Sequence, residues 1–403
     1  MDEESNQTGE KSSVGRLFLP SIVMSRFATT PRGIILSLLL IEIGLTFGLP
    51  VGVTGQVGTA GSIAAFVSSL FMGVLSVRFK HKSLLMTGLL LLSVALLGCS
   101  QAPNFTLLLI FTVLAGLGGA MVMPMTTTLV AKHLPLKKRA RALGLLMATL
   151  SVSFLIGAPV ISYISDIGGW RLSFLVYALP FPLLGLLLDV KGLPHESESE
   201  QTSLKKGNLI DGYKGVLSNR SAVACLLGNA LSSATFAGIT LYAISFYRQH
   251  FLVSKGMATY FMIGFSLSYT VGALISSRFV NKLGRKPVTS ISVFITGIFI
   301  FFFTIVPNLW LSLGLTLTGC LFAGMRATAN VSLTIEQVPE FRGTVMSISA
   351  ASANIGSALG SGLGGLALLF FNYEAVGPSL GLLGIASAII VYLFAVDPTR
   401  VQI

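Results

Sequence analysis

Two charged residues lie deep inside apolar stretches, and they are the first candidates for chemistry. Arg326 lies within the apolar run 309–335, and Glu42 lies at the midpoint of the run 33–53. A guanidinium near the centre of a membrane-spanning helix costs roughly 2.5 to 3.5 kcal/mol, which a nearby carboxylate would offset. The protonation of that carboxylate would then depend on how close the guanidinium is. The two residues therefore predict a shared cavity in which proton binding competes with the binding of another ligand.

Other interpretations of these two residues stay open. Glu42 and Arg326 could form a static pair whose loss only destabilises the protein. One of them could instead reach water through a crevice. Arg326 could also serve as the counter-ion of an anionic substrate, in which case substrate and proton would bind together rather than compete.

The composition indicates the elements that must position such residues. Of 403 residues 53% are hydrophobic and only 10% are charged, and the mean hydropathy is +0.82. A soluble domain usually carries about 25% charged residues, so this chain is expected to lie in a lipid bilayer. Runs of about 20 apolar residues span a bilayer as helices, and strands of alternating polarity are absent. Twelve such runs lie near 33–53, 58–77, 83–100, 105–131, 142–164, 172–188, 222–246, 257–277, 288–306, 309–335, 344–370 and 376–396. The predicted fold class is an all-α membrane protein with 12 transmembrane helices in two pseudo-symmetric six-helix bundles.

The positive charges predict how the chain is oriented. The net charge of +12 does not indicate nucleic-acid binding, because the basic residues do not form one face of a soluble domain. All but four of the 27 basic residues fall in the N-terminal tail, the even-numbered gaps between runs, and the C-terminus. The exceptions are Arg171, Arg248, Lys255 and Arg326. The positive-inside rule then places both termini in the cytoplasm of a multi-pass plasma-membrane protein.

A polar segment divides the predicted spans into two groups of six. In the run His195–Glu200 glutamate alternates with histidine or serine, and Lys205 and Lys206 follow it. Such a segment is typical of a domain linker. We therefore predict a cytoplasmic tail at 1–32, a bundle at 33–188, a cytoplasmic linker at 189–220, a second bundle at 221–397 and a tail at 398–403. Residues 204–217 could form a surface helix within the linker.

Basic turns recur at matching positions in the two groups. After the second predicted span these residues are Gly73, Arg78 and Lys82, and after the eighth they are Asn281, Lys282, Gly284, Arg285 and Lys286. A Pro-x-x-x-Arg turn follows the fourth span at Pro135, and Pro339 opens a similar basic turn after the tenth. This repetition indicates a duplicated six-helix unit, which is one known plan for transporters.

These basic turns, the sequence Gly168-Gly169-Trp170-Arg171 and the central linker together resemble the major facilitator superfamily over almost the whole chain. The resemblance is greatest to twelve-span drug/proton antiporters and sugar-efflux-type permeases. It implies that the first, fourth, seventh and tenth helices line a central cavity, and that the basic hairpins brace a cytoplasmic gate. It also implies a secondary transporter that exchanges protons for a small organic solute in the efflux direction. Proton-coupled or facilitated uptake of a small organic anion is the alternative.

Further polar residues lie on the four helices that the resemblance assigns to the cavity. As substrate or proton-coupling candidates we single out Asn229, Asn330, Tyr242, Thr46 and Thr112. Such residues also commonly join helices within a membrane. The glycine-rich stretch 350–365 is expected to pack tightly against another helix for the same reason.

The sequence favours neither an enzyme nor a metal or cofactor site. All four histidines lie outside the apolar runs, and no cluster has metal-ligand or acid/base spacing. The cysteines Cys99, Cys225 and Cys320 are expected to be buried apolar residues. We expect a monomer whose partners are its solute, protons and the lipid bilayer.

Overall fold

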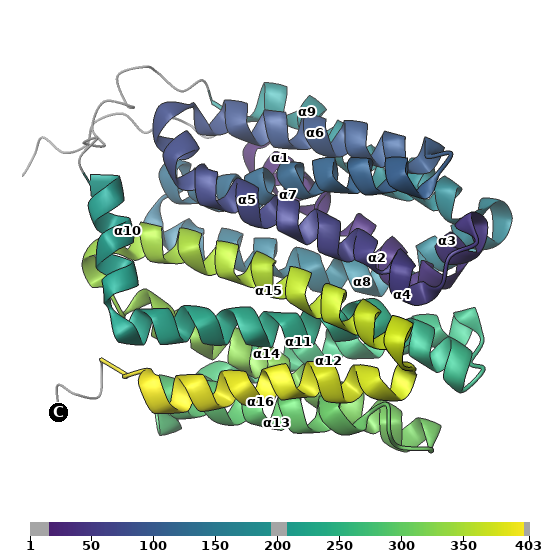
Figure 1. The fold of residues 1–403 in the computed structure, drawn as a ribbon. Helices are drawn as coiled ribbons and strands as arrows, with labels where there is room; N and C mark the ends of the chain where they lie inside the picture. Colours follow the sequence, from purple (N-terminus) through teal and green to yellow (C-terminus); the bar gives the residue numbers. More distant parts are fainter. Residues whose placement is uncertain (1–15, 195–207, 399–403) are drawn as a thin grey trace, which may run out of the picture.

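The computed structural model describes residues 16–194 and 208–398, and helices form nearly all of this part of the chain. In Figure 1 the first half, purple to blue, packs as one bundle against the second half, green to yellow. In chain order the main helices are α1 (Phe18–Phe27), α2 (Pro31–Leu38), α3 (Leu40–Phe47), α4 (Val51–Thr54), α5 (Gln56–Arg78), α6 (His81–Gln101), α7 (Phe105–His133), α8 (Leu136–Leu172), α9 (Pro180–Gly192), α10 (Asn208–Ser218), α11 (Arg220–His250), α12 (Lys255–Leu283), α13 (Arg285–Phe302), α14 (Leu309–Ile335), α15 (Arg342–Phe370) and α16 (Val376–Phe394). A π-helical turn, Ser173–Ala178, joins α8 to α9.

The helices account for twelve membrane spans. Within the described residues, ten helical segments are long and apolar enough to cross a bilayer, and the bent segment Phe18–Phe47 makes eleven. One of the ten, Arg141–Gly192, has 52 residues. At 1.5 Å per residue it would be about 78 Å long, against a bilayer core of about 30 Å. It is interrupted at Gly169, whose φ of 72° only glycine adopts readily, so it forms two spans. The predicted fold class is confirmed.

The first span begins earlier than predicted. We expected a tail up to residue 32, but α1 starts at Phe18, and α1 and α2 lead into α3 through a bend of 68°. Proline does not interrupt these helices because Pro20 lies in the first turn of α1 and Pro31 is the first residue of α2. Glu42 consequently lies near the end of the span, not at its midpoint.

The predicted linker also starts too early. Helix α9 continues to Gly192, and Asp189 is fully buried, with its Oδ2 accepting a hydrogen bond of 2.8 Å from Ser25 Oγ. This bond ties the end of α9 to α1. Helix α10 overlaps the stretch 204–217, where we predicted a surface helix, and Tyr213 of α10 donates a hydrogen bond to Leu70 O at 3.2 Å. The tails 1–15 and 399–403 and the segment 195–207, which includes the acidic run, lie outside the described residues.

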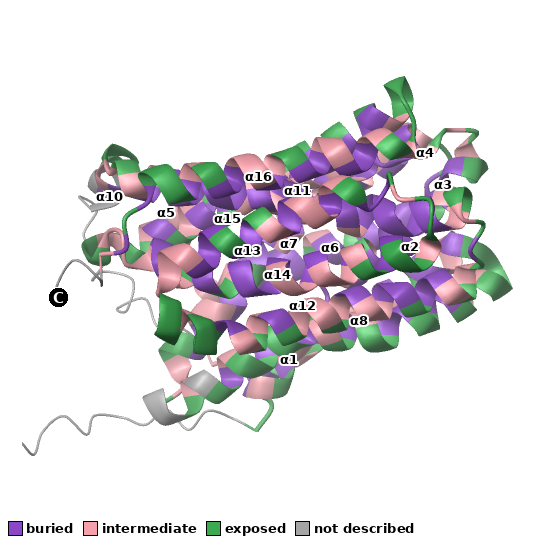
Figure 2. Ribbon diagram, turned by 90° about the horizontal axis from the view of Figure 1, so that it is seen from below, coloured by how far each residue is buried: buried purple, intermediate pink, exposed green. Residues whose placement is uncertain are grey.

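Burial follows the contacts between helices. Figure 2 shows buried positions concentrated where helices face one another and exposed positions along the outer faces. Many exposed side chains are large and apolar, such as Ile110, Leu274 and Tyr392. An outer surface of this kind suits lipid rather than water.

Glycines allow α15 to lie directly against α11, as expected for the stretch 350–365. A Cβ added to Gly356 would lie 2.0 Å from Ala230 O, and one added to Gly360 would lie 1.9 Å from Ala234 O. The two helix backbones are therefore in contact at these points, which stabilises the second half by close packing.

Candidate functional site

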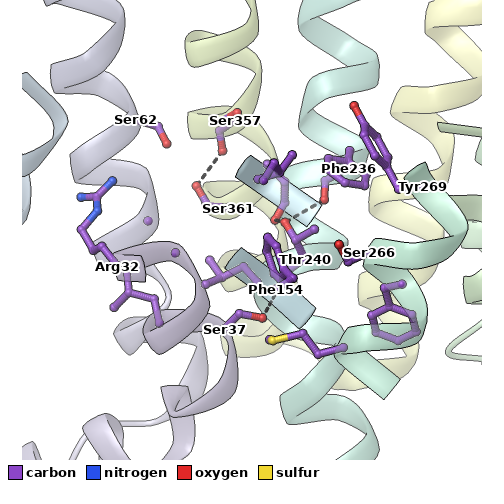
Figure 3. Close-up of a pocket in the computed structure, with 18 of the residues that line it drawn as sticks. Arg32, Ser37, Ser62, Phe154, Phe236, Thr240, Ser266, Tyr269, Ser357 and Ser361 are labelled. Carbon is purple, nitrogen blue, oxygen red and sulfur yellow. Dashed lines mark hydrogen bonds between the residues drawn. The ribbon is translucent and has the colours of Figure 1, made fainter. Parts of the chain in front are cut away.

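A cavity of about 270 Å³ lies between the two halves of the molecule (Figure 3). The first half contributes α2, α5 and α8, and the second contributes α11, α12 and α15. These are the first, second, fifth, seventh, eighth and eleventh spans. The implied set of first, fourth, seventh and tenth helices is thus only partly right, because α7 and α14 lie behind the residues that line the cavity.

The cavity wall is largely apolar and aromatic. Figure 3 labels three aromatic residues of the wall, Phe154 of α8, Phe236 of α11 and Tyr269 of α12. Most hydroxyl groups in the wall already bond within the protein. Ser37 Oγ donates to Thr240 O and so links the two halves, and Ser361 Oγ donates to Ser357 O at 2.7 Å. Few strong polar groups remain for a ligand.

Arg32 is the one charged residue of the cavity wall. Its Nη1 donates a hydrogen bond of 3.1 Å to Thr112 O of α7, and none of the described carboxylates pairs with it. Gly61 of α5 provides the space for the guanidinium, since a Cβ there would lie 2.6 Å from Nη1. Sequence reasoning assigned Arg32 to the N-terminal tail. The available signal was the apolar set Leu17, Phe18, Ile22 and Val23 upstream of it, which extends the first span.

Glu42 and Arg326 do not form the predicted pair. Arg326 is buried, and its Nη1 donates to Asn229 Oδ1 at 3.1 Å and to Ser232 Oγ at 2.6 Å. Asn330 Nδ2 also donates to Asn229 Oδ1, at 3.3 Å. Amide and hydroxyl oxygens rather than a carboxylate therefore solvate this guanidinium. The structure brings together Arg326, Asn229 and Asn330 as a group, but none of them lines the cavity.

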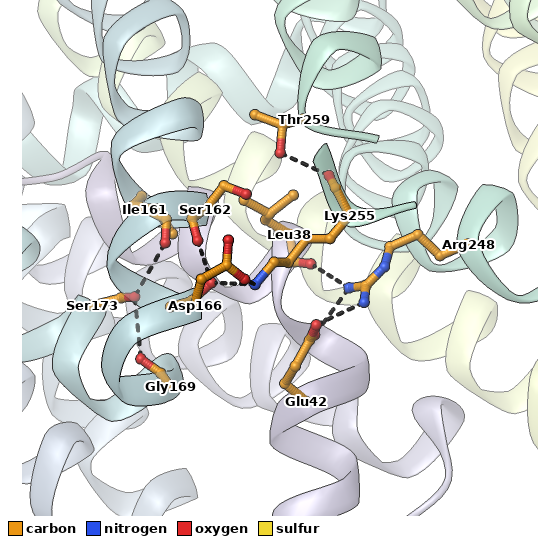
Figure 4. Close-up of polar contacts among 11 residues, drawn as sticks. Leu38, Glu42, Ile161, Ser162, Asp166, Gly169, Ser173, Arg248, Lys255 and Thr259 are labelled. Atoms are coloured by element: carbon orange, nitrogen blue, oxygen red, sulfur yellow. Dashed lines mark hydrogen bonds and ion pairs between the residues drawn. The ribbon is translucent and has the colours of Figure 1, made fainter. Parts of the chain in front are cut away.

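Glu42 instead pairs with Arg248 at the end of α11 (Figure 4). The Nη2–Oε1 distance is 2.7 Å and the Nη1–Oε2 distance is 3.0 Å, and Nη1 also donates to Leu38 O at 3.1 Å. The pair is two-pronged, which fixes its geometry. Because α3 belongs to the first half and α11 to the second, this pair joins the halves.

A second ion pair joins the halves beside it. Lys255 at the start of α12 pairs with Asp166 of α8 and donates to Ser165 Oγ at 2.8 Å. Figure 4 shows the two pairs close together, and they lie at the end of the molecule opposite α10 in Figure 1. The two ion pairs thus join the halves at that end of the interface.

The remaining candidates from the sequence make structural contacts. Thr46 Oγ1 donates to Glu42 O at 2.8 Å and accepts from Trp170 Nε1 at 2.9 Å. Tyr242 is fully buried and donates to Ser361 O at 2.7 Å, which links α11 to α15. Thr112 accepts the hydrogen bond from Arg32 through its backbone carbonyl oxygen. Its hydroxyl donates to Leu108 O at 2.8 Å.

The basic hairpins contact their own halves. Lys82 Nζ donates to Val190 O in the last turn of α9 and to Leu193 O just after it, and Lys286 Nζ lies 5.6 Å from the ring centroid of Tyr392. Arg285 N donates to Asp397 Oδ2 at 3.1 Å, and Gly284, with φ of 93°, is the residue just before α13. Gly73 is half-buried, whereas Arg78, Asn281 and Lys282 are exposed. These contacts join the starts of α6 and α13, the third and ninth spans, to the ends of the sixth and twelfth spans.

Comparison with known proteins identifies the family. The model of the Major Facilitator Superfamily matches residues 22–247 and again residues 226–402. The chain belongs to the Major Facilitator Superfamily. It is therefore a transporter of small molecules and a multi-pass membrane protein, and nothing in the family indicates an enzyme.

Members of the Major Facilitator Superfamily with different solutes resemble this chain. It is 25% identical over 345 residues to the probable sugar efflux transporter of Pasteurella multocida, which covers 84% of this chain and 82% of the relative. It is 34% identical to the niacin transporter NiaP of Acinetobacter baylyi, but over only 127 residues, 32% of this chain and 29% of the relative. The solved structure of a D-xylose–proton symporter matches with a TM-score of 0.75 and 16% identity, covering 94% of this chain and 98% of that one. This likeness shows the shared fold.

Proposed function

We propose that the protein is a proton-coupled secondary transporter that expels a small organic solute across the cytoplasmic membrane by alternating access. The observation that carries this proposal is the position of the cavity relative to the cross-half ion pairs. The cavity is formed by both halves, and one end of the interface is held by the pairs Glu42–Arg248 and Lys255–Asp166. Opening that end requires only these pairs and the nearby packing to separate, while each half stays intact.

Glu42 is proposed as the proton-sensitive residue. Protonation removes its negative charge and leaves Arg248 without its partner, which favours separation of the halves at that end. In an outward cycle the proton arrives from outside, the end opens and the solute leaves. Re-formation of the pair requires Glu42 to lose its proton to the cavity, which then faces the cytoplasm. As in the hypothesis drawn from the sequence, proton binding and solute binding compete. The proposed partner of Glu42 is now Arg248 instead of Arg326.

The orientation of the protein is proposed from its charge. The excess of basic residues in alternate gaps supports cytoplasmic termini and a cytoplasmic linker. A monomeric protein of the plasma membrane is part of the same proposal. The ion pairs then face outside. The basic hairpins containing Arg78, Lys82 and Arg285 are proposed to brace the cytoplasmic end by holding each half together there.

Uptake of a small organic anion is a second candidate. Arg32 favours it, because a cavity with one unpaired guanidinium is suited to a negatively charged solute. The direction of transport does not follow from that preference. Similarity to the probable sugar efflux transporter of Pasteurella multocida supports the outward direction for the present chain.

Proteoliposomes containing trapped pyranine test the function. Addition of anionic, cationic, sugar and nucleoside solutes in turn should produce a proton movement for one class, against the solute in antiport and with it in symport. Glu42→Gln should abolish this proton movement while solute counterflow persists. Thr240→Trp, which fills the cavity, should abolish both. Solutes that bind but never cross the membrane would show that the protein is not a carrier.

A further inference from the structure

We propose that Arg32 binds the anionic group of the transported solute, and that this solute is an amphipathic organic anion with an aromatic or similarly bulky apolar body. The inference rests on the proposed transport function and specifies the substrate class of the same cavity. It replaces Arg326, the anion site that the sequence suggested, with a residue that the cavity contains.

The balance of charge inside the spans supports an anionic ligand. Three guanidiniums, those of Arg26, Arg32 and Arg326, lack a carboxylate partner among the described residues. Arg26 donates to Met123 O at 3.2 Å, and Arg326 is surrounded by Asn229 and Ser232. Arg32 alone lines the cavity. An unpaired cation in a membrane protein is costly, and a bound anion would offset that cost.

The local geometry leaves Arg32 able to bind a ligand. A guanidinium has five N–H donors, and the contact with Thr112 O uses one of them. The close approach to Gly61 and the carbonyl of α7 hold the group in place. A carboxylate can accept two parallel hydrogen bonds from the remaining fork, which gives a strong and oriented contact.

The rest of the wall defines the other part of the ligand. Phe236 and Phe265 of the second half line the cavity, and so does Phe154 of the first half, which also contributes Arg32. Aromatic walls bind a flat apolar body well. A cationic solute would be repelled by the positive charge of Arg32, and a neutral solute would leave the guanidinium without a counter-ion. Both should therefore bind less well than an anion. The anion would contact Arg32 of one half while its apolar body contacts the other half, so that occupancy couples the two.

Three compounds of matched shape test this assignment. Naphthoate, naphthamide and naphthylmethylammonium share a ring system and differ in charge. Their binding to the full-length protein in nanodiscs is measured by titration calorimetry, with empty nanodiscs subtracted to remove partition into lipid. We expect naphthoate to bind about tenfold more tightly than the amide, and the cation to bind most weakly.

The variants separate charge from geometry. Arg32→Gln should abolish the preference for naphthoate over naphthamide, and Arg32→Lys should restore part of it. Gly61→Ala keeps the charge but displaces the guanidinium, so it should also reduce the preference. Arg16→Gln removes the same charge at an exposed position and should leave the preference unchanged. If Arg32→Gln does not fold, as judged by its thermal unfolding, Gly61→Ala and Arg32→Lys still decide the matter.

Several results would overturn the assignment without affecting the proposed function. One such result is that all three compounds bind equally well to the wild type and none binds to Thr240→Trp. The cavity would then be a solute site, but it would not select for an anionic group. Another is a preference for naphthoate that survives both Arg32→Gln and Gly61→Ala. Absence of binding by every naphthyl compound would reject this substrate class, while the pyranine assay with other solutes tests transport itself.

Discussion

Glu42 on α3 and Arg248 on α11 form a two-pronged ion pair with N–O distances of 2.7 and 3.0 Å. Arg248 also bonds to Leu38 O, at the bend between α2 and α3. The same guanidinium therefore joins the two halves and contacts the bend within the first span. A change in the charge of Glu42 acts on both features, which is why this residue is central to the proposed coupling.

Replacement of Glu42 by glutamine should affect transport far more than stability. The Glu42 side chain is 29% exposed and that of Arg248 is 15% exposed, and pairs reached by water contribute about 0–1 kcal/mol. We therefore expect a small decrease in the thermal unfolding temperature, but loss of transport driven by a pH gradient with counterflow retained. Pyranine-loaded proteoliposomes and radiolabelled solute measure the two activities. Equal loss of both activities would show that Glu42 has a structural role only.

Removal of both ion pairs should open the end of the interface that we propose to face outside. The double variant Glu42→Gln, Asp166→Asn retains every basic residue but loses both carboxylates. A reporter cysteine at Ser37, in the cavity wall, should then react several-fold faster with a membrane-impermeant maleimide added outside. The native Cys99, Cys225 and Cys320 are buried, so they give a low background. Unchanged labelling would mean that packing, not charge, keeps this end closed.

The number and order of the helices could be predicted because lipid imposes a simple rule on sequence. Each span is a run of about 20 apolar residues, and this pattern survives without knowledge of the tertiary contacts. The first span was the exception. Arg26, Pro31 and Arg32 interrupt the apolar pattern, so the predicted span began after them. In the structure the prolines occupy first-turn positions and both arginines bond to carbonyls of α7.

That shift in the first span explains most of the error in the predicted site. A residue's depth depends on where its span begins, so the earlier start moved Glu42 to the end of the span and placed Arg32 in the cavity wall. Arg326, Asn229 and Asn330 were each singled out because polar side chains stand out in apolar runs, but the sequence did not predict that they bond to one another. The partner of Glu42 could not be found in this way, because Arg248 lies at a helix end where a charged residue is unremarkable.

Arg326 should act on stability and not on the pH dependence of transport. Arg326→Ala removes donors from Asn229 Oδ1 and Ser232 Oγ and leaves a space in a buried region, at a cost of about 2–4 kcal/mol. Arg326→Met fills most of that space and should cost less. Because Arg326 and Glu42 do not pair, both variants should keep the wild-type pH profile of proton-coupled transport. A shifted profile in the folded Met variant would show that the two residues communicate.

The glycines of α15 allow the sharpest test of the packing. Gly360→Ala and Gly362→Ala make the same chemical change two residues apart on one helix. The new Cβ at position 360 would lie 1.9 Å from Ala234 O, so α11 and α15 must separate, whereas at position 362 the nearest atom is 3.6 Å away. Alanine favours a helix over glycine by about 1 kcal/mol, so Gly362→Ala should be neutral or slightly stabilising. Overpacking typically costs about 1–3 kcal/mol, so Gly360→Ala should lower the unfolding temperature despite the same gain. The comparison cancels the effect of helix propensity, and equal unfolding temperatures for the two variants would contradict the direct contact of these helices.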